Sequence, residues 1–404
     1  MKRILSLFGI LSLLFLLLTG FVIQKNVEKV RMEERIRFAV EQEVLQAGAI
    51  LKSGKVLNPR TMESGKVKYI PKDDWTSGFY PGSLWYLYEL TRDESWRILA
   101  KRQTEAIDSV KYLTWHHDVG FMIQCSFGNG LRLGEKEYKE VIIRAAKSLS
   151  TRFRQAAGIF QSWNTDKGWQ SQRGWECPVI IDNMMNLELL FNATRLSGDS
   201  SFYRLAVSHA DHTLKNHYRP DYSCYHVVDY SLKDGSVRSR QTAQGYTNES
   251  AWARGQAWGI YGFTVCYRET HDLKYLRQAQ RAFDFVAHHK NFPKDGVPFW
   301  DFDAPKIPNE PRDASAAAIL ASALYELSGF ENNAYYKGWA DKIMVSLSGP
   351  AYRAKSGENG NFILMHSVGS IPHGAEIDVP LNYADYYYLE ALIRSRRIAG
   401  RTGR

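Results

Sequence analysis

The chain has 404 residues, enough for a large core in one or two domains. Its formal net charge is +9, but no basic run is interleaved with aromatic residues, which argues against a nucleic-acid-binding protein. The charge fits an acidic small or oligomeric ligand, and the abundance of aromatic residues (11 Trp, 23 Tyr and 19 Phe) suits contacts with sugar faces.

Residues 1–23 are typical of an export signal, because Lys2 and Arg3 precede a long apolar run. The run is about long enough to cross a bilayer, so an uncleaved N-terminal anchor is the alternative. No Cys follows it, which argues against a lipoprotein. We therefore expect an exported, periplasmic protein whose residues 24–404 form one domain.

Twelve helices are predicted in chain order, and short turns alternate with long loops between them. The helices that follow long loops are apolar, whereas the others carry the charges. This pattern predicts an all-α (α/α)6 barrel, a toroid with an inner and an outer ring of helices. Residues 219–247 alternate in polarity and favour a small hairpin. The predicted helices cover 27–53, 79–90, 94–113, 121–131, 136–153, 181–196, 202–216, 251–270, 273–288, 314–327, 333–347 and 383–399.

The long loops open at the end of the toroid where the inner helices begin. Converging helix N-termini create a positive field that favours an anionic ligand. Acidic residues near these starts can be helix caps, and carboxylates held close together acquire different pKa values. These residues are Asp74, Asp118, Asp182, Glu249, Asp313 and Asp378.

Asp182 lies where the apolar run at 177–181 becomes a buried helix. Two interpretations stay open: a helix N-cap, or a catalytic acid whose pKa is raised by burial. Neither Glu nor Gln stands three residues later, so no capping box is present.

Two further motifs carry candidate chemistry. In "WHHDVGFM", His117 and Asp118 form a pair before an inner helix; the alternative is a capped helix start. In "WARGQAW", Arg254 and Trp258 share one helix face, so the guanidinium can grip a carboxylate while the indole stacks on a sugar. The alternative for Arg254 is a structural pair with a buried Asp.

Aromatic residues and serines in the loops complete the picture. Several aromatic side chains on one rim argue for a saccharide cleft, and Ser367 and Ser370 either donate to an anion or form an ordinary turn. The four cysteines have no metal-ligand spacing, so we expect neither a metal nor a cofactor. The apolar helical contexts of Cys125, Cys177 and Cys266 favour buried thiols over disulfides. The aromatic residues are Trp75, Phe79, Trp163, Trp169, Trp175, Trp300 and Phe302, and the cysteines are Cys125, Cys177, Cys224 and Cys266.

Six segments between residues 74 and 392 together resemble glycoside hydrolase family 88, the unsaturated glucuronyl hydrolases. They are "DWTSGFYPG", "HDVGF", "IDNMMNLELL", "QGYTNESAWARGQAWGIYGF", "PRDASAAAI" and "DVPLNYADYYYLEAL". The resemblance implies that Asp182 is the catalytic acid/base and Asp118 the second essential carboxylate. The residues implied at the sugar-acid subsite are His117, Gln244, Arg254, Trp258, Trp75, Phe79 and His226.

The resemblance further implies that Ser367 and Ser370 meet a sulfate on the next sugar. A Lys often follows in that pattern, whereas this chain has Ile371, Pro372 and His373. The implied substrates are glycosaminoglycan oligosaccharides that an upstream polysaccharide lyase leaves with a 4,5-unsaturated uronate.

The implied reaction hydrates the double bond of that uronate. Asp182 protonates C-4, water adds at C-5, and the resulting hemiketal opens and releases the saccharide. Burial and the neighbouring Asp118 are both expected to raise the pKa of Asp182.

Three alternatives stay open at this point. An unsaturated rhamnogalacturonyl hydrolase acting on pectin fragments would share the fold and the chemistry. An inverting glycosidase would use Asp118 and Asp182 as acid and base across a saturated linkage. A non-catalytic glycan-binding protein would use the same cleft without chemistry.

Overall fold

The computed structural model describes residues 28–331 and 333–401. The predicted signal or anchor at 1–23 lies outside this range. Among the described residues, no helix combines the length and the apolar character needed to cross a bilayer.

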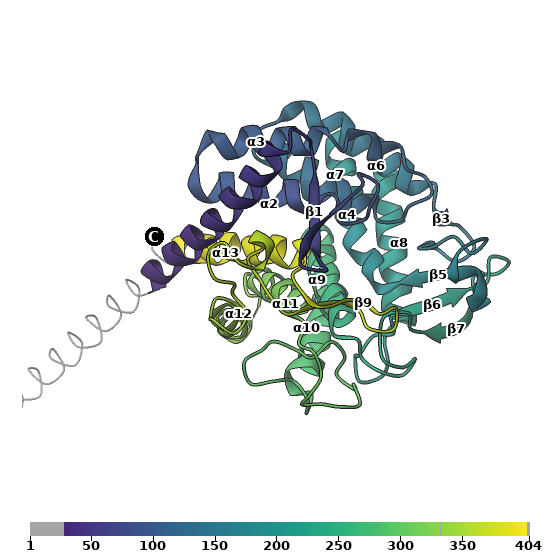
Figure 1. The fold of residues 1–404 in the computed structure, drawn as a ribbon. Helices are drawn as coiled ribbons and strands as arrows, with labels where there is room; N and C mark the ends of the chain where they lie inside the picture. Colours follow the sequence, from purple (N-terminus) through teal and green to yellow (C-terminus); the bar gives the residue numbers. More distant parts are fainter. Residues whose placement is uncertain (1–27, 332, 402–404) are drawn as a thin grey trace, which may run out of the picture.

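Six inner segments form a closed ring, because α13 packs on both α11 and α2 (Figure 1). Every residue of α11 except Glu326 is buried, as expected for a helix that is apolar on all faces. The (α/α)6 prediction is confirmed. The inner segments are α2 (Phe79–Thr91), α4 (Val119–Ile123) with η2 (Gln124–Gly128) and α5 (Asn129–Arg132), η5 (Ile181–Asn186) with α7 (Leu187–Ser197), α9 (Ala253–Thr270), α11 (Ala314–Leu327) and α13 (Asn382–Arg401).

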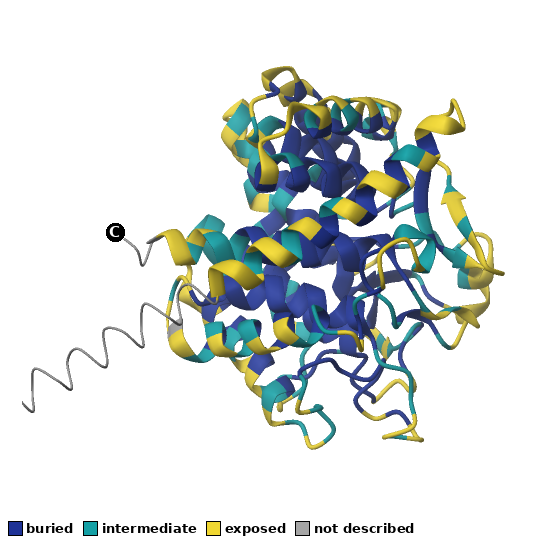
Figure 2. Ribbon diagram, turned by 60° about the vertical axis from the view of Figure 1, so that its left-hand side comes forward, coloured by how far each residue is buried: buried dark blue, intermediate teal, exposed yellow. Residues whose placement is uncertain are grey.

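The outer helices bury one side against this ring and expose the other (Figure 2). Short turns lead into three of them, where Asp93, Asp199 and Asp272 each accept a bond from a backbone N–H of the first turn. The outer ring comprises a helix at 28–52, α3 (Glu94–Glu105), α6 (Lys139–Ser150), α8 (Ser200–Asn216), α10 (Leu273–His288) and α12 (Asn333–Leu347). Short helical turns are η1 (Asp108–Tyr112), η3 (Lys136–Tyr138), η4 (Trp169–Arg173) and η6 (Asn359–Asn361).

Short antiparallel sheets lie in the long loops. The three-stranded sheet joins β5 (Cys177–Ile180), β6 (Val227–Tyr230) and β7 (Val237–Gln241), so the hairpin predicted within 219–247 is confirmed. The remaining pairs were not predicted. They are β1 (Asn58–Glu63) with β2 (Lys66–Ile70), β3 (Phe153–Arg154) with β4 (Ile159–Phe160), and β8 (Ser367–Ser370) with β9 (Ala375–Val379).

Two predicted inner helices begin differently from the prediction. The segment at 121–131 contains a π-helical turn, η2, in which the Ser126 hydroxyl donates to the Met122 carbonyl. The segment at 181–196 begins as the 3₁₀ turn η5, because β5 pairs with β6 and holds the chain extended up to Ile180. All four cysteines are buried free thiols, as predicted for Cys125, Cys177 and Cys266.

Candidate active site

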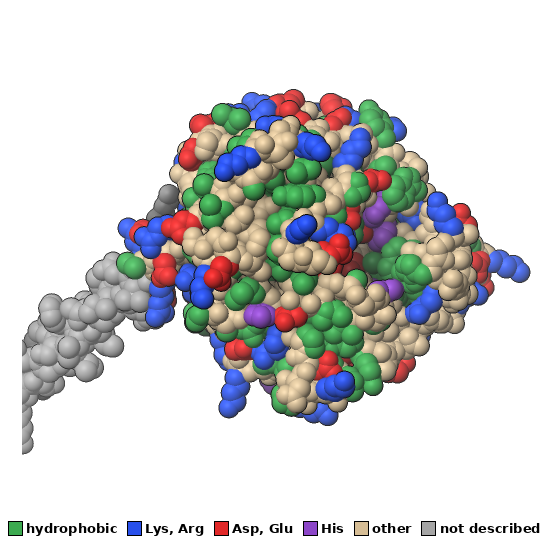
Figure 3. All heavy atoms as spheres, viewed as in Figure 1, with side chains coloured by type: hydrophobic (Ala, Val, Ile, Leu, Met, Phe, Trp, Pro, Cys, Tyr) green, Lys and Arg blue, Asp and Glu red, His purple; other side chains and the backbone are tan. Residues whose placement is uncertain are grey.

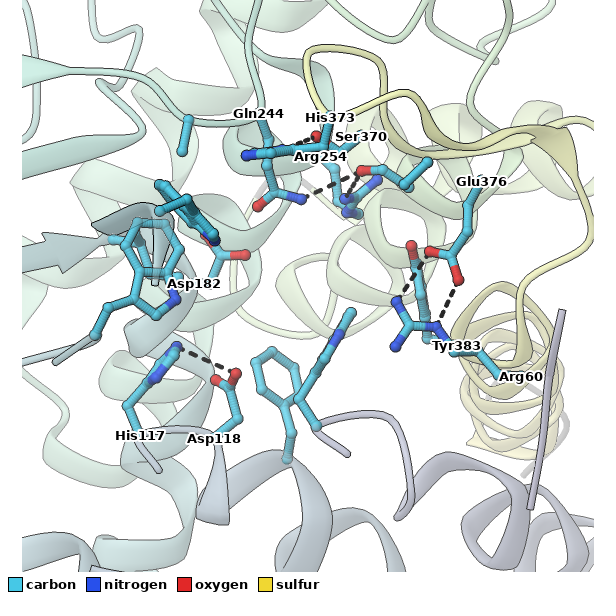
Figure 4. A pocket seen from close by; sticks show the side chains of 18 residues that line it. Arg60, His117, Asp118, Asp182, Gln244, Arg254, Ser370, His373, Glu376 and Tyr383 are labelled. Atoms are coloured by element: carbon cyan, nitrogen blue, oxygen red, sulfur yellow. Dashed lines mark hydrogen bonds and ion pairs between the residues drawn. The ribbon is translucent and has the colours of Figure 1, made fainter. Parts of the chain in front are cut away.

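A pocket of about 880 Å³, counting the part open to solvent, lies where the inner helices begin. In Figure 3, histidine and acidic side chains gather at a hollow on this face of the molecule. Figure 4 shows the pocket from close by, with Asp118 and Asp182 on one side of the space and Arg60 and Glu376 on the other. Seven predicted site residues line it: Trp75, His117, Asp118, Asp182, Gln244, Arg254 and Ser370.

Asp182 lies in η5, and its side chain makes no capping bond to the helix. The N-cap interpretation is therefore wrong for this residue. Its side chain is 12% exposed, and burial raises its pKa to about 7, although the charge of Arg254 acts in the opposite direction. Asp182 Oδ2 is buried without a hydrogen-bond partner among the described residues.

His226 lies directly behind Asp182, with Nε2 at 3.7 Å from Asp182 Oδ2. Its Nδ1 accepts bonds from the backbone N–H groups of Ala243 and Gln244, both at 3.1 Å. This network assigns the proton to Nε2, which faces the carboxyl. Burial lowers the pKa of His226 well below its usual value, so the ring is neutral.

A raised pKa alone does not identify the catalytic acid. Burial also raises the pKa of Asp385 to about 7, yet both oxygens of that carboxyl accept bonds from backbone N–H groups, those of Ile363 and Leu364. Asp385 therefore has a structural role, whereas Asp182 lines the pocket.

Asp118 occupies the N-cap position of α4 without a side-chain capping bond. Its Oδ2 lies 3.1 Å from His117 Nε2, and Asn186 Nδ2 donates to its Oδ1 at 3.4 Å. Burial and the charge of Asp182 raise the pKa of Asp118 well above its usual value. The repulsion between the two carboxylates, which was expected to raise the pKa of Asp182, instead raises the pKa of Asp118. The pKa of Asp182 is raised by burial.

Asn186 was missed by the sequence reasoning. It stands four residues after Asp182 in the same motif and also accepts a bond from the Phe121 N–H at 3.2 Å. Gly120 permits this approach, since a Cβ at that position would lie 2.5 Å from Asn186 Cα. The polar residue that ends "IDNMMN" was the available signal.

Arg254 lines the pocket, but its guanidinium is already bound by an Asp side chain and by backbone carbonyls. Its Nη1 donates to the Val368 carbonyl and pairs with Asp313 Oδ2 at 3.2 Å, while Nη2 donates to the Gly369 carbonyl at 2.6 Å. The structural pair with a buried Asp, the alternative interpretation, is what the structure contains. Gln244 Nε2 donates to the same Gly369 carbonyl at 3.2 Å.

Four predicted sugar contacts lie behind the pocket wall instead of lining it. Phe79 and Trp258 are buried against other aromatic rings, His226 supports Asp182, and the Ser367 hydroxyl is buried without a partner among the described residues. These four residues do not contact the space of the pocket, because each one is enclosed by the loops and inner helices that form the wall. They support the wall from behind.

Two of the six acidic residues expected at the helix starts lie elsewhere. The Glu249 side chain is 74% exposed and pairs with Arg219, and Asp378 lies in β9 beside His366. The prediction that all six converge is wrong, since the loops before α9 and α13 carry these two residues outward.

Other wall residues complete the pocket. The rings of Trp163 and Trp175 are stacked at 5.6 Å, and Trp169 lies 5.1 Å from His373, so the predicted aromatic rim is present on this side. The predicted rim residues Trp300 and Phe302 are instead buried core. Arg60 and Glu376, which also line the pocket, had no local sequence signal.

One group of described residues has donor atoms close enough for a metal ion. The donors of His116, His117 and Asp118 lie within 4.8 Å of one another. His116 Nδ1 already accepts from the Asp118 N–H at 3.1 Å, so only Nε2 of that ring is left for an ion.

Comparison with known proteins supports the resemblance to glycoside hydrolase family 88 over most of the chain. The model of Glycosyl Hydrolase Family 88 matches residues 55–391. An unsaturated glucuronyl hydrolase from Formosa agariphila is 47% identical over 345 residues, which are 84% of this chain and 85% of that protein. One from Bacillus sp. (strain GL1) is 36% identical over 350 residues, 83% of this chain and 90% of that protein.

Among solved structures, an unsaturated glucuronyl hydrolase specific for heparin has a TM-score of 0.86 and 45% identity to this chain. The match covers 91% of this chain and 97% of the other. The toroid, the paired carboxyl groups and the family model that spans most of the sequence agree, and the chain belongs to glycoside hydrolase family 88.

Proposed function

We propose that the protein is an unsaturated glucuronyl hydrolase. It releases the 4,5-unsaturated uronic acid from the non-reducing end of glycosaminoglycan oligosaccharides by hydrating the C4=C5 double bond. The observation that carries this proposal is the buried Asp182 carboxyl, which lines the pocket and has a pKa of about 7. The relatives named unsaturated glucuronyl hydrolase and unsaturated chondroitin disaccharide hydrolase support it.

A carboxyl group with a pKa near neutrality can both give and take a proton at working pH. Protonated Asp182 gives its proton to C-4, and the positive charge that develops at C-5 is shared with the ring oxygen. Water then adds at C-5 and returns a proton to the Asp182 carboxylate. The hemiketal opens, and the saccharide leaves from C-1.

Asp118 and His117 hold the sugar beside this acid. Neutral His117 provides a hydrogen-bond donor, and the raised pKa of Asp118 disfavours a second negative charge next to the uronate. The indole of Trp75, packed 5.0 Å from the Tyr383 ring, offers an apolar face for the sugar. Arg254, whose guanidinium is held by Asp313 and the β8 carbonyls, lines the pocket and contributes a buried positive charge on the side of the uronate carboxylate.

A panel of unsaturated disaccharides tests the proposal. Disaccharides produced by lyases from chondroitin, heparin, hyaluronan and rhamnogalacturonan are incubated with the protein while the absorbance of the conjugated double bond is followed. Decay with a glycosaminoglycan disaccharide supports the proposal, and decay with rhamnogalacturonan alone would assign the pectin alternative. Loss of decay in Asp182→Asn with retained sugar binding excludes a purely glycan-binding protein.

The substrate chemistry suggests the preceding step and the location. A terminal 4,5-unsaturated uronate is the product of β-elimination, so a polysaccharide lyase supplies the substrate. Export directed by residues 1–23 would place the enzyme in the periplasm, either free or anchored. Cell fractionation with N-terminal sequencing of the mature protein distinguishes these two forms from a protein that stays in the cytoplasm.

A further inference from the structure

The wall opposite Asp118 and Asp182 is the β8–β9 hairpin (Figure 4). Arg254 and Gln244 hold its first strand through the Gly369 carbonyl, and the Val368 N–H donates to Asp313 at 3.3 Å. The hairpin contributes Gly369, Ser370, His373, Ala375 and Glu376 to the pocket lining. Its position therefore sets the width of the pocket.

The second strand is fastened by Arg60, which lies in β1 near the other end of the chain. Arg60 Nε and Nη2 donate to the two oxygens of Glu376 at 2.5 and 3.0 Å, and Nη1 donates to Asp74 Oδ2 at 2.7 Å. Two parallel bonds of this kind are strong and directional. The side chains of Arg60 and Glu376 are only 18% and 13% exposed, so solvent screens them weakly.

The backbone at Glu376 adopts a conformation that few residues with a side chain adopt. Its φ is 55°, in the left-handed region that a side chain with a Cβ rarely adopts. This conformation directs the carboxylate into the pocket wall, where Gly369 leaves room for it: a Cβ at Gly369 would collide with the Glu376 carboxylate. A strained residue whose side chain is held by two bonds is a feature of positioned sites.

The other partner of Arg60 leads to the sugar platform. Asp74 Oδ1 accepts from the Thr76 N–H at 2.9 Å and so fixes the turn that carries Trp75. Trp75 lines the pocket beside Tyr383. Arg60 thus joins the aromatic platform to the hairpin across the mouth of the pocket.

We propose that Arg60 is a positioning residue that fixes Glu376 relative to Trp75, and that the Glu376 carboxylate accepts hydrogen bonds from hydroxyl groups of the bound sugar. Each carboxylate oxygen keeps one acceptor position after binding Arg60. This inference rests on the proposed function, because it assumes a saccharide in the pocket. Asp182 is held independently by η5 and β5, so the contact between Arg60 and Glu376 affects substrate binding more than the chemical step.

The test compares Arg60→Met, Arg60→Lys, Glu376→Gln and the double variant Arg60→Met/Glu376→Gln. Lys68→Met is the matched control, because Lys68 lies on the adjacent strand β2 and pairs with Glu63 in an exposed position. With an unsaturated disaccharide, Arg60→Met and Glu376→Gln are expected to raise KM about tenfold while kcat changes less than about threefold. Lys at position 60 restores part of the loss, and the control keeps the original KM.

The KM of the double variant is expected to be no higher than that of the more impaired single variant, because both changes remove the same contact. Because Gln is nearly isosteric with Glu, Glu376→Gln remains a usable test even if Arg60→Met does not fold. An unchanged KM in Glu376→Gln would overturn the inference. A parallel loss of kcat and melting temperature without rescue by Lys would reduce Arg60 to a structural residue and also overturn it.

Calorimetric binding of the disaccharide to the same variants in an Asp182→Asn background separates this inference from the proposed function. An inactive wild-type protein would refute the proposed hydration. The inference about Arg60 and Glu376 is refuted only if substitutions at these two residues leave disaccharide binding unchanged.

Discussion

Replacing Asp182 by Asn is expected to stabilise the protein at neutral and alkaline pH while abolishing hydration. Burial raises the pKa of this carboxyl from 3.8 to about 7. One pKa unit corresponds to about 1.4 kcal/mol, so ionised Asp182 costs about 4 kcal/mol of the free energy of unfolding above pH 7. Asn has the shape of the neutral acid and does not ionise, which removes this cost.

The sign follows from the direction of the shift. A carboxyl whose pKa is raised by folding contributes its full stability below the unfolded value and loses it as pH rises through the folded value. The advantage of Asp182→Asn over the wild type should therefore be near zero at about pH 4, grow up to about pH 7, and stay constant above it.

Urea denaturation of both proteins at several pH values measures this difference. Asp385→Asn is the matched comparison: burial also raises its pKa to about 7, but an amide NH₂ would face a backbone N–H, so this variant is expected to show the same dependence on pH while being less stable than Asp182→Asn at every pH. A stability difference between Asp182→Asn and wild type that does not vary with pH, or a variant that is less stable at pH 8, would refute the reasoning.

Four further predictions concern the pocket. The kcat of the wild type should fall about tenfold per pH unit above pH 7, as Asp182 loses the proton it donates; a flat profile to pH 9 would contradict this. Asn186→Ala should raise KM about tenfold with a smaller change in kcat, because Asp118, which holds the sugar, loses its amide donor. Gly120→Ala should lower the free energy of unfolding by about 1–3 kcal/mol, measured in urea, since its Cβ would meet Asn186. Trp169→Ala should raise KM for oligosaccharides more than for disaccharides, because its ring lies at the half-exposed rim, and equal effects on both would argue against a rim subsite.

The toroid was predictable because its evidence is local. The apolar helices such as α11 and the capped starts of α3, α8 and α10 are each encoded within about twenty residues of sequence. The short strands were harder, since the extended conformation of β5 depends on pairing with β6, about fifty residues away. That pairing is also why Asp182 sits in a 3₁₀ turn instead of capping a helix.

The site was predictable where a motif contains its own chemistry, as in His117–Asp118 and Asp182. It was not predictable where partners are distant. Arg60 and Glu376 are 316 residues apart, and nothing in either neighbourhood indicates the other. For Arg254 the residue was identified, but its carbonyl partners in β8 were not, because that strand has no sequence signature.

The most direct test of the central claim compares an unsaturated disaccharide with its saturated counterpart. Hydration requires the C4=C5 double bond, because the proton from Asp182 goes to a carbon and not to the glycosidic oxygen. The account predicts loss of the conjugated absorbance and saccharide release with the unsaturated substrate, and no release with the saturated one. Cleavage of both substrates at comparable rates would contradict it.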